Sequence, residues 1–351
     1  MMTWFDSSGP TDWADSLRKL APSQYDVYHM PWYVKLYETE HRRAECFIFE
    51  EGENLYVYPF LRGPIQYKGF EHLSDISSPY GYCGPVSSTC EVGFLSRAAD
   101  AFEREAMRRG VVAELVKFNP MLGNHVIYGQ EGRGYRLTAC CQVVYVDLLL
   151  EESLRWESQY SHSNRKNINK SVRVGAKAQF GVLPDQWDKF SDLYHKTMEA
   201  NSAAERYFFS KTYFESLRSL GVDSCEIISV DLDGKCCAAM LVLFGSENIY
   251  CHLIGTDRDS MKHGVNNFLH HELIVWAKAR GYKNMLIGGG RTNAEDDPLL
   301  KFKKNFSNST KDFFVGERVF NSDAYEKLKS EFQSAGNNVE RLLFYRQDGG
   351  F

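Results

Sequence analysis

The pattern of apolar and polar positions predicts the same succession of elements twice along the chain. In the first run, two helices precede two strands, a helix and a strand: Asp12–Leu20, Trp32–Tyr37, Ala44–Phe49, Leu55–Leu61, Val92–Arg109 and Val112–Phe118. In the second run, two helices precede three strands, and a long helix and two further strands follow: Asp185–Ala200, Ser210–Leu220, Ser224–Asp231, Lys235–Phe244, Asn248–Gly255, Val265–Arg280, Lys283–Ile287 and Asp312–Val319.

Two runs of one pattern indicate a duplicated unit of class α/β, each copy with a mixed sheet and helices on its faces. We expect a first domain at residues 1–150 and a second at 178–351, the latter including the C-terminal tail. The basic segment 151–177 is expected to hold a helix that bridges them. Since no low-complexity linker separates the halves, an interdomain cleft is expected.

The stretch from Ile249 to Ser307 contains the strongest local signals. A β-rich strand is followed by the polar turn Thr256–Gly264, and a helix then begins at Val265. The next strand runs directly into Gly288–Gly289–Gly290, where a bulge or a close backbone approach to a substrate is expected. A helix N-terminus placed directly after a strand presents free backbone N–H groups, which suits a phosphate or pyrophosphate.

Composition narrows the class of protein. The 351 residues are 43% apolar and 14% aromatic, enough for two cores, and the net charge of −5 disfavours bulk binding to DNA. The nine cysteines show no CxxC spacing, so free thiols are expected in place of disulfides or a metal site. No apolar run is long enough to span a membrane and no secretory signal is present, which predicts a cytoplasmic protein.

The stretch Ile249–Ser307 and five further segments, in the same order along the chain, resemble one family. The five segments are DISSPYGYCGP (75–85), KFNPMLGN (117–124), NRKNINKSVRVG (164–175), YHKTMEANSAAERYFFSKTYFESL (194–217) and LLFYR (342–346). They are similar to segments of the Fem-type aminoacyltransferases and the BioF2-like acyltransferases, two GNAT folds in tandem. This resemblance implies two GNAT-like domains and an acyltransferase activity. One departure is Asn119, where relatives often carry His, so proton transfer by that side chain is not expected.

Candidate site residues come from both halves. Asp75 and His252 are the candidate catalytic groups, and the candidate substrate-binding residues are aromatic, basic or next to the glycines: Tyr80, Tyr82, Lys166, Lys170, Arg173, Arg206, Tyr207, Gly289 and Arg291. Lys166, Lys170 and Arg173 share one helix face at i, i+4 and i+7, suited to phosphate groups or simply solvated. Of Lys301, Lys303 and Lys304, at least two are expected in solvent.

The turn before the long helix is the candidate donor site. Its candidate residues are Arg258, Lys262, His263, Gly264 and Asn266. GNAT enzymes usually carry a Gly-rich signature there, and this chain has only Gly264, so a plain strand–helix turn is an equal alternative.

Three functions stay open. The favoured one is transfer of an acyl group from acyl-coenzyme A to an amine. The family resemblance, and not the spacing of residues, implies the acceptor, an amino sugar on a nucleotide-linked precursor of surface polysaccharide. A second is aminoacyl transfer from aminoacyl-tRNA to a peptidoglycan precursor; the acidic chain, without a long charged helical arm, disfavours tRNA. A third is a non-catalytic module that binds a nucleotide sugar.

Overall fold

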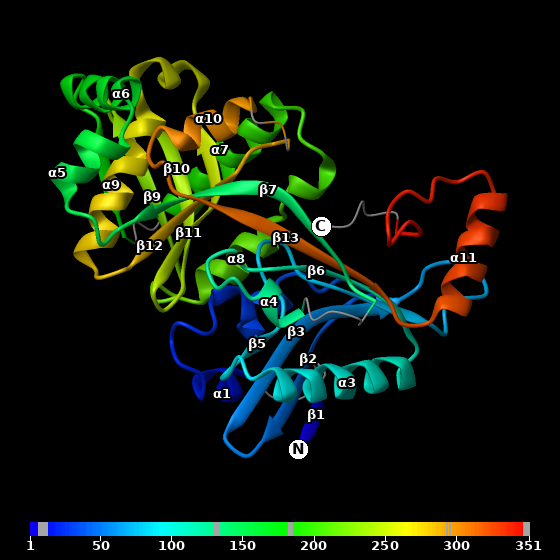
Figure 1. Ribbon diagram of the computed structural model, residues 1–351. Helices are drawn as coiled ribbons and strands as arrows, with labels where there is room; N and C mark the ends of the chain where they lie inside the picture. Colours follow the sequence, from blue (N-terminus) through cyan, green and yellow to red (C-terminus); the bar gives the residue numbers. More distant parts are fainter. Residues whose placement is uncertain (6–12, 129–133, 182–184, 293, 295, 347–351) are drawn as a thin grey trace. The chain divides into compact units, whose positions relative to one another are not determined.

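The computed structural model describes residues 1–5, 13–128, 134–181, 185–292, 294 and 296–346. The chain forms two compact units (Figure 1). Unit 1 comprises Met1–Cys140 and Phe313–Phe351, and unit 2 comprises Cys141–Asp312. Unit 1 thus contains an N-terminal and a C-terminal segment of the chain, and unit 2 is inserted between them in the sequence.

Unit 1 is built on a mixed sheet in the order β1-β2-β3-β4-β6-β13. Among these described strands, β4 and β6 pair in parallel and the other neighbours pair antiparallel. Helix α3 lies along this sheet, and its apolar side packs into a phenylalanine-rich core (Figure 1). The elements assigned wholly or mostly to this unit are β1 (Met2–Phe5), α1 (Trp13–Arg18), η1 (Val27–His29), α2 (Pro31–Lys35), β2 (Arg43–Glu51), β3 (Asn54–Pro64), β4 (Ser74–Ser77), β5 (Val86–Ser87), α3 (Val92–Arg108), β6 (Val111–Lys117), α4 (His125–Tyr128), β13 (Thr310–Val319) and α11 (Ser322–Ser334).

Unit 2 has a mixed sheet in the order β7-β12-β11-β10-β9-β8. Alternate side chains of β10 pack with α9 on one face, and α7 lies against the other face of β10 and β11. The elements are β7 (Arg136–Asp147), α5 (Glu152–Leu154), the π-helical turn η2 (Arg155–Gln159), α6 (His162–Arg173), β8 (Lys177–Phe180), α7 (Gln186–Ala200), η3 (Glu205–Tyr207), α8 (Lys211–Ser219), β9 (Cys225–Leu232), β10 (Lys235–Phe244), β11 (Asn248–Thr256), η4 (Arg258–His263), α9 (Val265–Ala279), β12 (Asn284–Gly289) and α10 (Pro298–Lys304).

The repeated mixed α/β pattern predicted from the sequence is confirmed, and most elements begin and end within two residues of their predicted bounds. Asp12, the predicted start of the first helix, lies outside the described residues. The two edge strands β1 and β8 and the short strand β4 were not predicted. β4 reads Ser-Asp-Ile-Ser, which has no strand-like composition, and it forms because β3 and β6 pair with its two edges.

The compact units divide the chain at other places than the predicted domains. The C-terminal segment, expected in the second domain, packs in unit 1, where Leu343, Phe344 and Tyr345 join a buried cluster with α11 and β6. The basic helix α6, expected as a bridge, packs within unit 2 against α9, where Asn267 donates to Asn164 at 2.8 Å. Both assignments depend on long-range packing that the local pattern does not contain.

All nine cysteines carry free thiols. Within the described ranges, no helix is both long and apolar enough to cross a bilayer. The same residues contain no group of three His, Cys, Asp or Glu side chains arranged to hold a metal ion.

Candidate active site

Strands β11 and β12, neighbours in the unit 2 sheet, pair over only part of their lengths. Their parallel pairing extends over three residue pairs and ends at Tyr250 opposite Leu286, although β11 continues to Thr256 and β12 to Gly289. Beyond that point β12 pairs through Gly288 and Gly289 with β7 on its other edge. The two strands therefore stop pairing in the middle of the unit 2 sheet, a kind of place at which α/β sheets present main-chain groups to ligands.

The side chain of Lys303, on α10, reaches this divergence. Its Nζ donates a hydrogen bond to the carbonyl oxygen of Gly289 at 2.7 Å. Burial lowers the pKa of Lys303 to about 8, and the neighbouring Cys251 of β11, Asp297 and Cys141 of β7 oppose that shift only in part. A half-buried ammonium thus lies beside the end of β12, with thiols from the two flanking strands around it.

Lys303 was missed as a site residue, although the sequence holds the signal. Leu299, Phe302, Lys303 and Phe306 fall at i, i+3, i+4 and i+7, so this lysine occupies a position of the apolar stripe. The expectation that at least two of the three lysines face solvent is met, because Lys301 and Lys304 are exposed.

The three successive glycines at the end of β12 each have a separate steric reason. Gly288 has φ +92°, next to the bulge in the β12–β7 pairing, which confirms the predicted bulge. A Cβ on Gly289 would lie 3.0 Å from the carbonyl oxygen of Gln142, and one on Gly290 would lie 2.7 Å from the carboxylate of Asp297. The glycines therefore allow β12 to turn away from β11 and to run closely past β7 and α10.

Asp297 holds the loop that follows these glycines. Its Oδ1 accepts hydrogen bonds from the backbone N–H groups of Leu299 and Leu300 at the start of α10, and its Oδ2 accepts from those of Arg291 and Thr292. These N–H donors lower the pKa of Asp297 to about 2. The carboxylate thereby fixes α10, and with it Lys303, relative to Gly289.

His252 lies on β11 beyond the point of divergence and is half-buried. Its Nε2 is 2.8 Å from the hydroxyl of Tyr213 on α8, and the ring of Phe209 stacks on Tyr213. Burial lowers the pKa of His252 to about 3, so the imidazole is neutral at physiological pH. A neutral imidazole in this position can orient a hydroxyl group or accept a proton only weakly, and the predicted catalytic role stays a prediction.

We expect the imidazole of His252 to show no titration between pH 5 and 8. Because burial disfavours its charged form, the folded protein takes up this proton only near pH 3, whereas the unfolded chain does so near 6.5. The unfolded chain therefore binds one more proton than the folded protein between about pH 3 and 6.5. The free energy of unfolding is unaffected by His252 above about pH 6.5 and decreases as the pH falls from 6.5 toward 3. Imidazole NMR shifts, assigned with His252→Gln, measure this directly; a midpoint between 6 and 7 would contradict it.

The structure places Asp75, a candidate catalytic group, inside unit 1, whereas a catalytic role requires that it face a substrate. Asp75 lies on β4 and is 0% exposed. Its carboxylate binds the guanidinium groups of Arg42, at 2.7 Å, and of Arg346. Burial alone would raise the pKa of Asp75, but the two arginines outweigh it and lower the pKa. Since both carboxylate oxygens are engaged, we correct the expectation that Asp75 projects toward a substrate.

Tyr80 and Tyr82 are half-buried in unit 1 within a cluster of aromatic rings. Tyr82 packs edge-on against Tyr28 and Phe313, and the ring of Tyr80 lies 6.2 Å from that of Tyr37. The backbone oxygen of Tyr80 accepts a hydrogen bond from Tyr33 at 2.7 Å. The exposed portions of Tyr80 and Tyr82 stay candidates for ligand contact. Contacts with Tyr28, Tyr33 and Tyr37 hold this segment in place.

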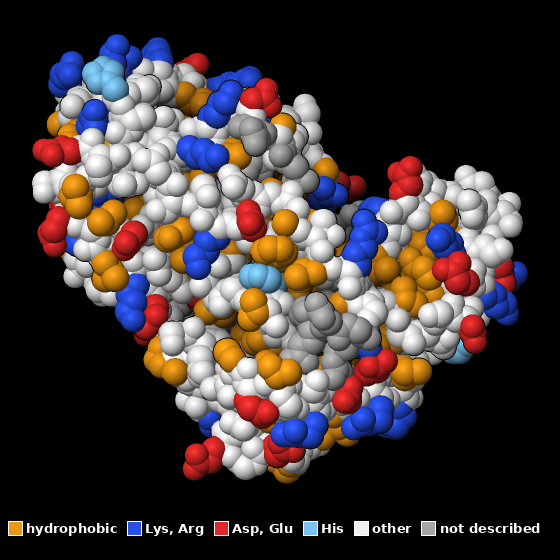
Figure 2. Space-filling view, in the orientation of Figure 1, with side chains coloured by type: hydrophobic (Ala, Val, Ile, Leu, Met, Phe, Trp, Pro, Cys, Tyr) orange, Lys and Arg blue, Asp and Glu red, His pale blue; other side chains and the backbone are white. Residues whose placement is uncertain are grey.

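The predicted basic face is exposed on unit 2. Lys166, Lys170 and Arg173 all face solvent on α6, and Figure 2 shows Lys and Arg side chains gathered over this helix at the upper left. The opposite face is anchored, since Asn164 is buried and Ser171 donates to the carbonyl oxygen of His263 at 2.7 Å. One side of α6 therefore serves packing and leaves the cations free for an anionic ligand.

Arg206, Tyr207 and Arg291 lie at the surface of unit 2. The guanidinium of Arg206 lies over the ring of Tyr207, whose carbonyl oxygen accepts a hydrogen bond from Tyr194 at 2.6 Å. Arg291 is exposed and donates to Asn201 at the end of α7, 2.9 Å away. The structure thus holds Arg291 beside α7, while the backbone of Gly289 lies at the divergence with Lys303.

The candidate donor loop forms the 3-10 turn η4 and the start of α9. Arg258 and Lys262 are exposed, and Gly264 begins α9 with φ +80° and no side-chain cap. A Cβ on Gly264 would lie 2.5 Å from the carbonyl oxygen of Asn167, so α6 presses directly on this turn. The side chain of Asn266 is occupied by Thr256 at 2.8 Å. His263, half-buried, completes the turn. The contact of Arg258 and Lys262 with donor phosphates stays a prediction.

Comparisons with known proteins bear on the fold and on the second half of the chain. Residues 162–336 match the family model of the acetyltransferase (GNAT) domain. The crystal structure of FemX is similar over 93% of this chain and 100% of its own, with a TM-score of 0.72 and 12% identity. The C-terminal domain of a putative lysylphosphatidylglycerol synthetase from Agrobacterium fabrum covers 91% of this chain and 96% of its own, with a TM-score of 0.56 and 15% identity.

A further similar structure is a tandem GNAT protein from the clavulanic acid biosynthesis pathway. It covers 91% of this chain and 99% of its own, with a TM-score of 0.50 and 8% identity. A search of curated proteins found no match.

The GNAT domain and the two sheet-and-helix units define the class of protein, which is an acyltransferase. Residues 162–336 belong to the acetyltransferase (GNAT) domain family, and the chain shares its fold with FemX and with the tandem GNAT protein, in agreement with the resemblance found in the sequence motifs. Its chemistry is the transfer of an acyl or aminoacyl group.

Proposed function

We propose that this protein transfers an acyl group from acyl-coenzyme A to the amine of an amino sugar carried on a nucleotide-linked precursor of surface polysaccharide. The observation that carries the proposal is the ammonium of Lys303, held 2.7 Å from the carbonyl oxygen of Gly289 where β11 and β12 diverge. A thioester carbonyl next to this ammonium would meet a positive charge in a place partly shielded from water. The match to the GNAT acetyltransferase domain supports the same donor.

The reaction needs few protein groups. The neutral amine attacks the thioester carbonyl carbon, a C–N bond forms, and negative charge develops on the carbonyl oxygen beside Lys303. The C–S bond then breaks, and the proton lost by the nitrogen goes to the leaving thiolate. Holding the two reactants together and stabilising the oxyanion supply most of the acceleration, so a half-buried cation suffices without a nucleophilic triad.

The acceptor class rests on the exposed cations of unit 2. Four basic side chains are exposed to solvent there: Lys166, Lys170 and Arg173 on α6, and Arg206 in η3. They can bind the phosphates of a nucleotide-linked sugar. The similarity to FemX and to a lysylphosphatidylglycerol synthetase supports a substrate of the cell envelope. We place the reaction in the cytoplasm, where acyl-coenzyme A is available.

A second candidate is aminoacyl transfer from aminoacyl-tRNA, and one observation favours it. The turn before α9 is pressed under Asn167, and the side chain of Asn266 is already bound to Thr256. Fewer backbone groups are thus open to a pyrophosphate than in a Gly-rich loop. An ester-linked aminoacyl group would use the same Lys303, and the basic face of α6 suits an RNA backbone.

A thermal-shift screen separates the two donors. A ligand at about 100 times its Kd adds about 2.7 kcal/mol to the free energy of unfolding. We expect coenzyme A and acetyl-coenzyme A to raise the melting temperature, together with a uridine-nucleotide sugar. Stabilisation by aminoacyl-tRNA and none by coenzyme A would decide for the second candidate. Stabilisation by the nucleotide sugar alone, with no turnover of either donor, would contradict acyl transfer by this chain.

Replacing both Arg258 and Lys262 by Ala should raise the KM for acyl-coenzyme A about 10-fold or more and leave kcat nearly unchanged. Both side chains are exposed next to the start of α9, and in this proposal they would contact the donor away from the reacting carbonyl. Steady-state kinetics measure this, with Lys211→Ala, an exposed lysine on α8, as the control. An unchanged KM would move the donor phosphates away from this turn.

A further inference from the structure

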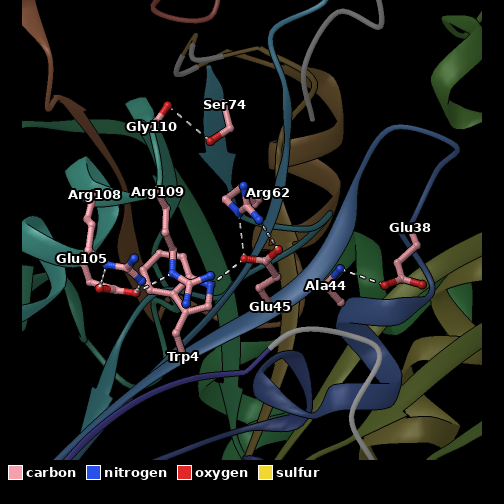
Figure 3. Close-up of polar contacts among 10 residues, drawn as sticks. All are labelled: Trp4, Glu38, Ala44, Glu45, Arg62, Ser74, Glu105, Arg108, Arg109 and Gly110. Atoms are coloured by element: carbon pink, nitrogen blue, oxygen red, sulfur yellow. Dashed lines mark hydrogen bonds and ion pairs between the residues drawn. The ribbon is translucent and has the colours of Figure 1, made fainter. Parts of the chain in front are cut away.

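Unit 1 contains a cavity of about 200 Å3 that the acyl-transfer chemistry does not use. It lies where β2 begins, β3 ends and β4 begins, next to the C-terminal end of α3. Figure 3 shows four residues of its lining, Glu45, Arg62, Ser74 and Arg109. The side chains of Arg43, Arg62 and Arg109 line it, together with His41, His72 and Ser74. Three guanidinium groups around one small hollow are unusual on a chain with a net charge of −5.

Arg62 is held in a fixed orientation at this cavity. Its Nε and Nη2 donate to the two oxygens of Glu45 at 2.8 and 2.9 Å, and the indole of Trp4 donates to the same carboxylate at 2.6 Å (Figure 3). Glu45 is buried and fully engaged, so it neutralises Arg62 and does not repel an anion from the cavity. The third nitrogen of the guanidinium, Nη1, takes no part in this ion pair.

Arg109 is oriented in a similar way. Its Nε donates to Glu105 at 2.6 Å, and its guanidinium lies 4.7 Å from the centre of the Trp4 ring. The two Nη atoms of Arg109 take no part in the bond to Glu105. Arg108 binds the same Glu105 at 2.7 Å and does not line the cavity, so one carboxylate supports two arginines of which a single one faces the hollow.

The charged side chains that line the cavity, three arginines and two glutamates, leave a formal charge of +1 with the imidazoles neutral. Arg43 is exposed, and its guanidinium donates hydrogen bonds to the main-chain oxygens of Thr39 and Arg42. Glu71, the other carboxylate in the lining, accepts a hydrogen bond from the N–H of Gly69 at 2.8 Å. Gly63 has no room for a Cβ, which would lie 2.5 Å from the carbonyl oxygen of His41, so the His41–Arg43 turn closes tightly on β3.

We propose that this cavity is an anion site that binds a phosphate or diphosphate group of a small molecule. A tetrahedral dianion can accept from several guanidinium groups at once, whereas a planar carboxylate is satisfied by one fork. Ser74 and the two imidazoles add hydrogen-bonding groups at its rim. The site belongs to unit 1 alone and does not depend on the proposed donor or acceptor.

Isothermal titration of the full-length protein with pyrophosphate and with inorganic phosphate at low ionic strength tests the proposal. Arg109→Ala should weaken pyrophosphate binding at least 10-fold. The matched control is Arg108→Ala, which removes the other ion pair to Glu105 and should change the affinity less than 2-fold. Arg43→Ala should also weaken binding, and Arg43 donates its hydrogen bonds to main-chain oxygens and not to a carboxylate. This variant replaces Arg109→Ala if circular dichroism shows that Arg109→Ala is unfolded.

Three results would overturn the proposal. Equal weakening by Arg108→Ala and Arg109→Ala would show unspecific attraction to surface charge. Binding that survives Arg109→Ala and Arg43→Ala but is lost when Arg258 and Lys262 are replaced would place the anion in unit 2. Acetate binding as tightly as phosphate would assign the cavity to carboxylates.

Discussion

Replacing Lys303 by Met should lower kcat about 10²- to 10³-fold, the usual cost of removing one group that stabilises the oxyanion. The ammonium lies 2.7 Å from the carbonyl oxygen of Gly289, between strands that have stopped pairing. Methionine has a similar length and no charge, so the packing is kept while the electrostatic contribution is lost. Steady-state kinetics with saturating donor and acceptor measure the effect.

The stability of this variant separates a catalytic from a structural role. Burial lowers the pKa of Lys303 to about 8, below the ordinary value of about 10.4, so folding works against its charge. The unfolded chain binds more protons between these values, and stability should rise with pH from about 8 to 10.4. Lys303→Met should therefore melt at or above the wild-type temperature and lose this pH dependence.

Lys301→Met is the matched control, because Lys301 is exposed on the same helix. It should keep wild-type kcat. Lys303→Arg retains a positive charge and should recover part of the activity lost in Lys303→Met. A Lys303→Met enzyme with near wild-type kcat would remove the ammonium from the mechanism and leave the divergence without its stabilising group.

Replacing Arg346 by Ala should destabilise unit 1 by about 3–5 kcal/mol, because breaking a buried ion pair leaves an uncompensated charge. Arg346 binds the fully buried Asp75 and also donates to the hydroxyl of Ser77 at 3.1 Å. This contact joins the end of the chain to β4, a strand in the middle of the unit 1 sheet. Urea unfolding followed by tryptophan fluorescence measures the loss.

Asp75→Asn should behave similarly, since it leaves Arg42 and Arg346 facing a neutral amide. The arginines hold the pKa of Asp75 below its ordinary value, so its stabilisation is present above about pH 4 and is lost as the pH falls below that. Arg341→Ala, an exposed neighbour, serves as the control and should stay within about 0.5 kcal/mol of wild type. A kcat defect in Asp75→Asn with unchanged stability would restore the catalytic interpretation.

The contrast between Asp75 and Lys303 shows why local sequence ranks site residues poorly. An aspartate beside prolines and glycines is typical of a ligand-binding loop, and here the carboxylate instead pairs with an arginine 271 residues further along the chain. A lysine in a run of three is typical of a solvated helix face, and here it reaches between two strands. Burial and the identity of the distant partner decide both cases, and neither is a local property.

The sequence by itself determined the class of fold, the two runs of elements and the family of acyltransferases. Period-2 and period-3.6 patterns report which face of each strand or helix is buried, and the glycine run reports a backbone that side chains would obstruct. Only the tertiary structure decided that the chain end closes unit 1, that β11 and β12 diverge beside Lys303, and that three arginines surround one cavity. These features arise from contacts between residues far apart in the chain, whose pairing is selected by packing and charge after the local elements have formed.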